Sequence, residues 1–213
     1  MLAEEKLMKS HLDPQNISAE THARIGLLGG SFNPAHKAHR AMSDYAMQKF
    51  GLDAIWWLVS PQNPLKLPGQ LKPYAERYQN ALTAAQNVQG LVATDMEARL
   101  GLIYSIDLLR HLRKNYPKIQ WLWLMGADNM VHFHYWKEWE EIFRQVPMAV
   151  FRRPPYTGMI RQSPAYQLFC GAEVLPTEPE KLFTGYLPAW TLADNVEIDL
   201  SSTEVREGSK QAW

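Results

Sequence analysis

The chain has 213 residues, 46% of them hydrophobic, which suffices for the core of one ordinary globular domain and makes a second full domain improbable. Its 22 Lys and Arg residues balance 22 Asp and Glu residues, so no overall charge attracts it to polymeric nucleic acid or to an acidic membrane. No stretch approaches the roughly 18 apolar residues that a membrane span needs.

The single cysteine, Cys170, excludes an intrachain disulfide and a multi-cysteine zinc site, which fits the reducing cytoplasm. Because free cysteines are usually buried, we expect Cys170 to be a buried thiol without a role. The first 22 residues mix charged and apolar side chains and lack the apolar block of a signal peptide. We expect residues 1–23 to form a poorly ordered or loosely docked extension and residues 24–213 to form the single folded domain.

From Arg24 onward, short apolar runs alternate with amphipathic stretches, as in repeated βα units. The pattern predicts an α/β fold, a Rossmann-like doubly wound parallel sheet with helices on both faces. Strands are predicted at 25–28, 55–59, 91–93, 121–125, 148–151 and 196–200. Helices are predicted at about 41–50, 74–88 and 104–115 and around 139–143. The segments 60–73 and 152–187 are rich in proline, so the first is predicted to be a loop and the second is left unassigned.

The turn Gly29–His36 joins the first predicted strand to the first helix. In a parallel sheet, such a turn offers backbone N–H groups and the positive end of a helix to a phosphate, and its glycines allow a close approach. His36 and His39 lie three residues apart, so both imidazoles can face one anion. Two surface histidines would explain His-x-x-His alone, but the strand and glycines before it favour a phosphate site.

A second candidate phosphate site lies near the end of the chain, in the segment Ser201–Arg206. Ser201 and Glu204 have the spacing of a capping box, which marks the start of a helix with free N–H donors. Arg206, on the first turns of that helix, could add a bidentate contact to a phosphate bound there. The chain ends seven residues later, so this helix would be short, and a partner subunit in a homo-oligomer could support it.

Both segments resemble the nucleotidyltransferases that share the (H/T)-x-G-H motif. Gly29–His39 is similar to that signature, with Ala38 where the family usually has glycine, and Ser201–Arg206 resembles the I-S-S-T-x-I-R motif that grips the β- and γ-phosphates of ATP. The resemblance implies catalytic roles for His36, His39 and Arg206. It implies that ATP is bound by Gly29, Gly30, Ser31, Phe32, His36, His39, Gly126, Asp128, Ser201, Ser202, Thr203 and Arg206.

Four internal segments are similar to those of the nicotinate-nucleotide adenylyltransferases in particular: Ser60–Lys66, Asp95–Glu97 with Tyr104–Asp107, Gly126–Asp128 with Trp136, and Arg153-Pro154. Ser105 and Leu108 stand where that family usually has threonine. The similarity implies that the mononucleotide is bound by Asn33, Lys66, Tyr104, Ser105, Trp136 and Arg153.

Three of these residues have a structural alternative. Trp136 would either stack on a pyridine ring or belong to the core, since large aromatic side chains bury area wherever they lie. Asp128 would either bind a nucleotide hydroxyl or cap the next helix, and Ser105 would either bind the mononucleotide or act as a cap. Gly29-Gly30 and Gly126–Asp128 both follow strands that meet at the switch point of a doubly wound sheet, so one cleft can contain both substrates.

The expected reaction is attack by a phosphate oxygen of nicotinate mononucleotide on the α-phosphorus of ATP. It yields nicotinate adenine dinucleotide and pyrophosphate, a step of NAD biosynthesis. Mg²⁺ is expected to enter with ATP, and no metal site made of protein ligands is expected. The alternatives are an adenylyltransferase for nicotinamide mononucleotide, phosphopantetheine or a sugar or alcohol phosphate, and a module that senses nucleotides without turnover.

Overall fold

Six parallel strands form the centre of the molecule, in the order β3-β2-β1-β4-β5-β6. The computed structural model describes residues 12–62, 64 and 69–193. The strands are β1 Ala23–Gly30, β2 Ala54–Val59, β3 Leu91–Thr94, β4 Ile119–Gly126, β5 Met148–Phe151 and β6 Trp190–Ala193. The chain reverses its direction of winding between β1 and β4, which pair along their length. The predicted α/β class, the parallel sheet and the single domain are confirmed.

The strands are apolar on both faces because both faces of the sheet are covered. In β2, Trp56 and Leu58 face one core, while Ile55, Trp57 and Val59 face the other. This alternation follows from the two-residue period of a strand, and continuous apolar runs are typical of parallel strands between helices. The sequence pattern of β2 therefore predicted its place in the interior.

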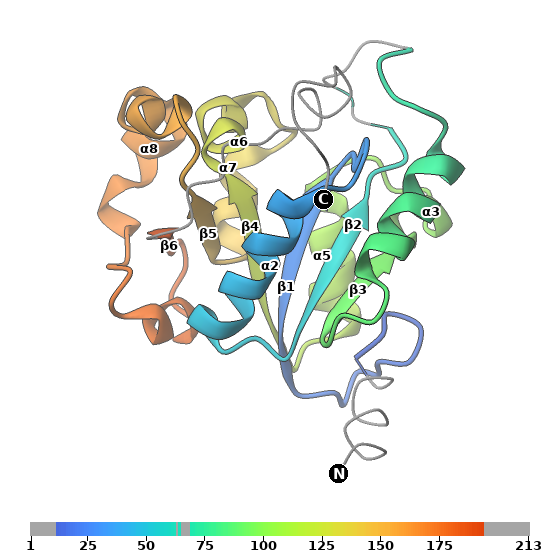
Figure 1. Cartoon of the computed structure of the whole chain (residues 1–213). Helices are drawn as coiled ribbons and strands as arrows, with labels where there is room; N and C mark the ends of the chain where they lie inside the picture. The colour runs from blue at the N-terminus through green and yellow to red at the C-terminus, as the bar shows by residue number, and fades with distance from the viewer. Residues whose placement is uncertain (1–11, 63, 65–68, 194–213) are drawn as a thin grey trace.

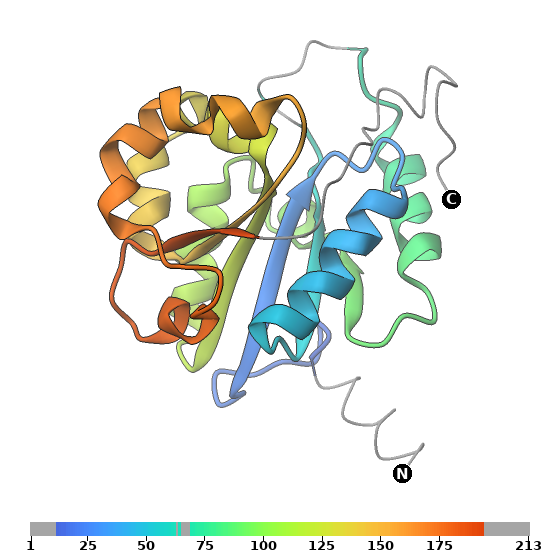
Figure 2. The same ribbon diagram turned by 60° about the vertical axis from the view of Figure 1, so that its left-hand side comes forward.

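Helices cover both faces of the sheet, as the two views show (Figures 1 and 2). One face carries α2 Lys37–Phe50, α3 Tyr74–Ala85 and the short 3-10 helix η4 Pro179–Phe183. The other carries α5 Ser105–Asn115, α6 Ala127–His132, α7 Trp139–Gln145 and α8 Pro164–Phe169, with α4 Met96–Arg99. Three further 3-10 helices are η1 Phe133–Tyr135, η2 Tyr156–Gln162 and η3 Cys170–Ala172. None of the described helices has both the length and the apolar character needed to cross a bilayer.

Helix α2 follows the first strand and positions the candidate phosphate-binding turn. Met42, Ala46 and Phe50 are buried on one side of it, as helical spacing requires. The helix ends at Gly51, whose φ of 59° lies in the left-handed region that glycine adopts without strain. Ala38, the residue that differs from the usual glycine of the motif, is buried in the first turn.

The later part of the chain differs most from the sequence expectations. Strand β6 was not predicted, because its four residues are short and follow an irregular proline-rich segment. The unassigned segment 152–187 contains η2, α8, η3 and η4. The expectation for Cys170 was wrong: its thiol is exposed, because the residue begins the surface helix η3. The predicted strand 196–200 and the helix of the Ser201–Arg206 motif lie outside the described residues.

The segment 12–22 contacts the domain near the beginning of β2. The indole N–H of Trp56 donates a hydrogen bond of 2.9 Å to the carbonyl of Leu12, and Leu12 and Ile17 pack against the core. These contacts place this segment at the opposite end of the sheet from the strands' carboxyl ends (Figure 1).

Candidate active site

Two imidazoles lie beyond the carboxyl end of β1, at the start of α2. His36 is the N-cap residue of the helix and is only 4% exposed, and its ring centroid lies 3.9 Å from that of His39. The backbone N–H of His36 donates to Nδ1 of His39 at 3.2 Å. Because Nδ1 accepts this bond, the proton of the neutral His39 ring belongs on Nε2.

The environment of His39 favours its neutral form. Burial lowers the pKa of His39 well below its usual value, and the electrostatic effects of His36 and Arg153 lower it further. The ring packs beside Phe32, at 4.6 Å between centroids, and Phe32 stacks in turn on Trp57. At neutral pH, His39 is therefore an oriented N–H donor without a positive charge of its own.

Two glycines near the ends of β1 and β4 leave room for neighbouring side chains. A Cβ on Gly29 would lie 3.1 Å from the indole of Trp123, so glycine leaves room for that ring. A Cβ on Gly126, the N-cap residue of α6, would lie 2.5 Å from Oδ1 of Asp128. Each glycine thus lets a neighbouring side chain lie against the end of a strand.

Arg77 connects the turn after β1 to the loop after β2. It lies on α3 and is 2% exposed, and its guanidinium donates to the carbonyls of Ser31, Ser60 and Pro61 at 2.6 to 2.8 Å. A fourth bond of 3.0 Å reaches the carbonyl of Lys72, at the approach to α3. One buried cation therefore fixes the backbone of both loops at the carboxyl edge of the sheet.

Asp128 and Arg153 form an ion pair at the ends of β4 and β5. The distance from Arg153 Nη1 to Asp128 Oδ2 is 3.0 Å, and both side chains are mostly covered. Asp128 makes no side-chain cap to α6, so the capping alternative for it does not hold. Its other oxygen, Oδ1, is buried without a hydrogen-bond partner among the described residues.

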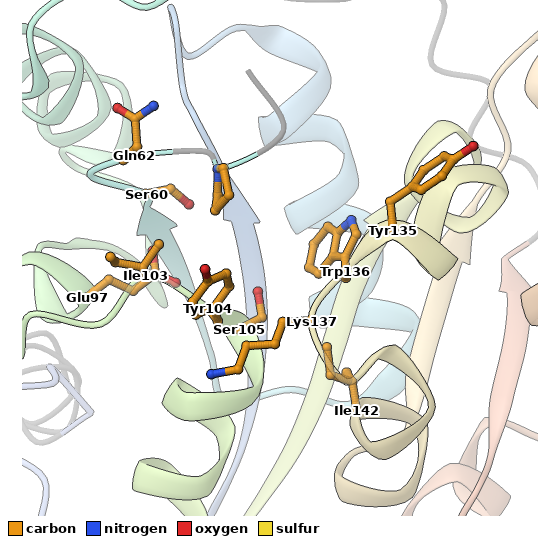
Figure 3. Close-up of a pocket in the computed structure, with 11 residues that line it drawn as sticks. Ser60, Gln62, Glu97, Ile103, Tyr104, Ser105, Tyr135, Trp136, Lys137 and Ile142 are labelled. Atoms are coloured by element: carbon orange, nitrogen blue, oxygen red, sulfur yellow. The ribbon is translucent and has the colours of Figure 1, made fainter. Parts of the chain in front are cut away.

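A pocket of about 90 Å³, partly open to solvent, lies on the other side of β1. Its walls come from the loop after β2, from α4, from the start of α5 and from the segment that follows η1 (Figure 3). Trp136 forms one side of the pocket, and Ser60, Glu97 and Ile103 lie opposite to it (Figure 3). The sequence-predicted residues Tyr104 and Ser105 line it as well.

The two sides of this pocket are held by contacts across it. Lys137 lies 4.5 Å from the centre of the Tyr104 ring and donates to the carboxylate of Asp107 at 3.3 Å. Trp136 packs against Phe133 and edge-on against Trp123, which leaves the indole only partly buried. Trp136 thus packs against the core and also lines the pocket, so its core alternative holds in part and its stacking on a pyridine ring stays a prediction.

Comparison with known proteins identifies the family. The cytidylyltransferase-like family model matches residues 27–208. The chain is 42% identical to a probable nicotinate-nucleotide adenylyltransferase of Caulobacter sp. (strain K31), over 86% of this chain and 96% of the relative. It is 40% identical to a protein of the same name from Bradyrhizobium sp. (strain ORS 278), over 86% and 95% of the two chains.

The chain belongs to the nicotinate-nucleotide adenylyltransferase family. Its fold also matches the solved structure of Plasmodium falciparum nicotinic acid mononucleotide adenylyltransferase complexed with NaAD, at a TM-score of 0.64. That match covers 89% of this chain and 85% of the other at 18% sequence identity, so it supports the fold alone.

The structure brings together part of the site that the sequence predicted for this family member. His36, His39, Gly126, Asp128 and Arg153 meet at the carboxyl edge, and Tyr104, Ser105 and Trp136 share the pocket. Arg153 and Asn33 do not line that pocket. Lys66, Ser201, Ser202, Thr203 and Arg206 lie outside the described residues.

Asn33 is fully buried and contacts backbone groups. Its side-chain N–H donates to the carbonyl of Gln70, and its Oδ1 accepts from the N–H of Lys72, both at 3.3 Å. Asn33 therefore holds the end of the loop after β2 against the turn after β1.

Glu97 is the pocket residue to which the sequence analysis gave no role, although the segment Asp95–Glu97 was noted as similar to the family. Its side chain is 5% exposed, and burial raises its pKa to about 7, although a hydrogen bond from the Ser60 hydroxyl opposes that rise. Oε2 has no hydrogen-bond partner among the described residues. The available signal was its position just after β3, where an acidic residue reaches the carboxyl edge of the sheet.

The described residues contain no group of three or more His, Cys, Asp or Glu side chains placed to hold a metal ion. Among these residues, the polar groups of the site are instead N–H donors and single carboxylates.

Proposed function

We propose that this protein transfers the adenylyl group of ATP to nicotinate mononucleotide and releases pyrophosphate, forming nicotinate adenine dinucleotide for NAD biosynthesis. One observation carries the proposal: an imidazole pair and a pocket containing Trp136 lie at the same edge of the sheet. The chain is also 40 to 42% identical to two relatives named for this activity. The turn after β1 receives ATP, and the pocket receives the pyridine ring of the acceptor.

In the proposed reaction, a phosphate oxygen of the mononucleotide attacks the α-phosphorus of ATP in line with the departing pyrophosphate. One P–O bond forms and the bond to the bridging oxygen breaks, so no protein nucleophile is needed. The acceptor phosphate is already an anion, and the protein contributes position and stabilisation of charge. His39 donates from Nε2 to a phosphate oxygen, and the N–H groups at the start of α2 and His36 act on the same triphosphate.

The remaining roles are assigned as the motifs imply. Arg206 and the Ser201–Thr203 segment bind the β- and γ-phosphates, and ATP enters as its Mg²⁺ complex. Gly29, Gly30, Ser31 and Phe32 shape the turn that the triphosphate approaches, and Asp128 binds a nucleotide hydroxyl through its unpartnered oxygen. Trp136 stacks on the pyridine ring, Ser105 and Tyr104 contact the acceptor, and Lys66 and Arg153 attract its phosphate.

A pyrophosphate-release assay tests this function directly. Purified protein is given MgATP with nicotinate mononucleotide, nicotinamide mononucleotide or phosphopantetheine, each in a separate reaction. We expect release with both pyridine mononucleotides and a higher kcat/KM for the acid. A preference for phosphopantetheine would assign a different acceptor, and nucleotide binding without any pyrophosphate would identify a sensing module.

A further inference from the structure

Glu97 is a buried carboxyl group in the wall of the pocket that we assign to the pyridine ring, so the inference here rests on the proposed function. One carboxylate oxygen is tied to the hydroxyl of Ser60, whose own backbone is fixed by the bond from Arg77. The other oxygen, Oε2, is buried and has no hydrogen-bond partner among the described residues. Figure 3 shows the side chain on the wall opposite Trp136.

An unpartnered carboxyl oxygen in a covered position is costly unless a ligand satisfies it. The acid and the amide mononucleotides differ in one ring substituent: a carboxylate, which only accepts hydrogen bonds, or a carboxamide, which also donates them. A protonated side-chain carboxyl can donate one hydrogen bond to the carboxylate of the acid mononucleotide. An ionised side-chain carboxylate repels that ligand carboxylate, but it can accept a hydrogen bond from the carboxamide of the amide mononucleotide.

We propose that Glu97 determines the choice between acid and amide acceptors, donating a hydrogen bond from its protonated carboxyl to nicotinate mononucleotide and accepting one, when ionised, from nicotinamide mononucleotide. The group changes its protonation state in the physiological range, because burial raises its pKa to about 7. Below that pH the side chain is mainly the donor, and above it mainly the acceptor. Preference for the acid therefore falls as pH rises through about 7.

Several other ionisable groups lie near Glu97 in the part of the chain that the structure describes. Tyr74 and Arg77 lie on α3, Asp95 precedes α4, Tyr104 precedes α5 and Lys137 follows η1. The pKa of Tyr74 is raised to about 12, chiefly by burial, so this side chain stays neutral in the pH range of interest. Lys137 is engaged by Asp107. All of these groups persist when Glu97 is replaced, so a change caused by the replacement belongs to Glu97.

The test measures kcat/KM for the acid and for the amide mononucleotide from about pH 5.5 to about pH 8.5, a range that brackets the pKa of Glu97. The quantity compared is the ratio of kcat/KM for the acid to kcat/KM for the amide. Titration of His39, or of the phosphate that both mononucleotides carry, affects both values and cancels in this ratio. In the unmodified protein we expect this ratio to fall about tenfold or more across the range, the size of one hydrogen bond to a charged group. In Glu97→Gln, which has the same shape and does not titrate, we expect the ratio to be independent of pH.

Two further variants test whether the pH dependence belongs to Glu97. Ser60→Ala removes the hydrogen bond that lowers the pKa of Glu97, so the midpoint of the change should move to higher pH. Glu173→Gln is the matched control, because the Glu173 carboxyl also has a pKa raised by burial but lies outside the pocket. Glu173→Gln should leave the ratio and its pH dependence unchanged.

Calorimetric binding of each mononucleotide in buffers of different ionisation enthalpy supplies a measurement that needs no turnover. Slightly above pH 7, binding of the acid should take up a fraction of a proton in the unmodified protein and none in Glu97→Gln. The inference is overturned if the acid-to-amide ratio does not change with pH, or if Glu97→Gln keeps the original pH dependence and proton uptake. Failure of the proposed function is a different result, in which the unmodified protein uses neither mononucleotide.

Discussion

At the level of single residues, the site depends on how neighbours set the protonation of its side chains. His39 is neutral because it is buried and because His36 and Arg153 further lower its pKa, and its Nδ1 accepts a hydrogen bond from the backbone N–H of His36. A donor fixed in this way needs little reorganisation when charge develops on a phosphate oxygen. Phe32 and Trp57 hold this ring in place through their packing against it.

Replacing His39 by alanine tests this role. We expect His39→Ala to lower kcat by about 10²-fold or more, the size of effect seen when one oriented transition-state donor is lost. Steady-state pyrophosphate release with ATP and nicotinate mononucleotide measures the change. His22→Ala, at an exposed histidine outside the site, should leave kcat unchanged. Full activity of His39→Ala would remove His39 from the mechanism.

For single residues, the sequence could predict only what residue types and their spacing reveal. Glycine pairs, histidines and a tryptophan at characteristic spacings were enough to mark His36, His39 and Trp136. The sequence carried no signal for the unpartnered oxygen of Glu97, because the desolvation of a carboxyl group depends on neighbours from other parts of the chain.

At the level of elements, the site is assembled where loops after parallel strands meet, and Arg77 is the main connection between two of these loops. It bonds backbone carbonyls in the loop that follows β1 and in the loop that follows β2. Periodicity predicted α3 and placed Arg77 on it. It could not predict the bonds, because they join positions that are 5 to 46 residues apart in the chain.

Replacing Arg77 by lysine keeps the charge and loses the planar group that reaches several carbonyls at once. We expect Arg77→Lys to lower the free energy of unfolding by about 3 kcal/mol, since buried carbonyls lose their partners. We also expect a higher KM for the mononucleotide, because Ser60 borders the pocket. Urea denaturation and steady-state kinetics measure the two effects.

The matched control is Arg113→Lys on α5. Arg113 is exposed, and its guanidinium donates to the backbone carbonyl and the side-chain oxygen of Gln145. This variant should differ little from the unmodified protein in both measurements. Equal behaviour of Arg77→Lys and Arg113→Lys would contradict the proposed link between the loops.

At the level of the whole molecule, one end of the sheet carries the candidate site and the other contributes to stability. The candidate site occupies the carboxyl ends of the strands, while the segment 12–22 covers Trp56 near the opposite end (Figure 1). Stability and turnover should therefore respond separately to changes at the two ends.

Truncation tests this separation. A chain that begins at residue 19 should be less stable than one that begins at residue 12 by about 2 kcal/mol, because it loses the packing of Leu12 and Ile17 and the bond to Trp56. Urea denaturation gives the difference. The kcat of the shorter chain below its unfolding transition should match that of the longer one. Equal stability of the two chains would show that the segment contributes nothing to the fold.

The sequence by itself determined the α/β class, five of the six described strands, the family and the turn that carries the imidazole pair. These features depend on local spacing: apolar runs that need cover on both faces, and short motifs whose residues are neighbours in the chain. Only the tertiary structure decided the place of β6, the exposure of Cys170, the Asp128–Arg153 pair, the Arg77 link and the buried carboxyl of Glu97. Each of these depends on which distant segments share the interior, since burial and pairing between segments come into being only when the sheet assembles.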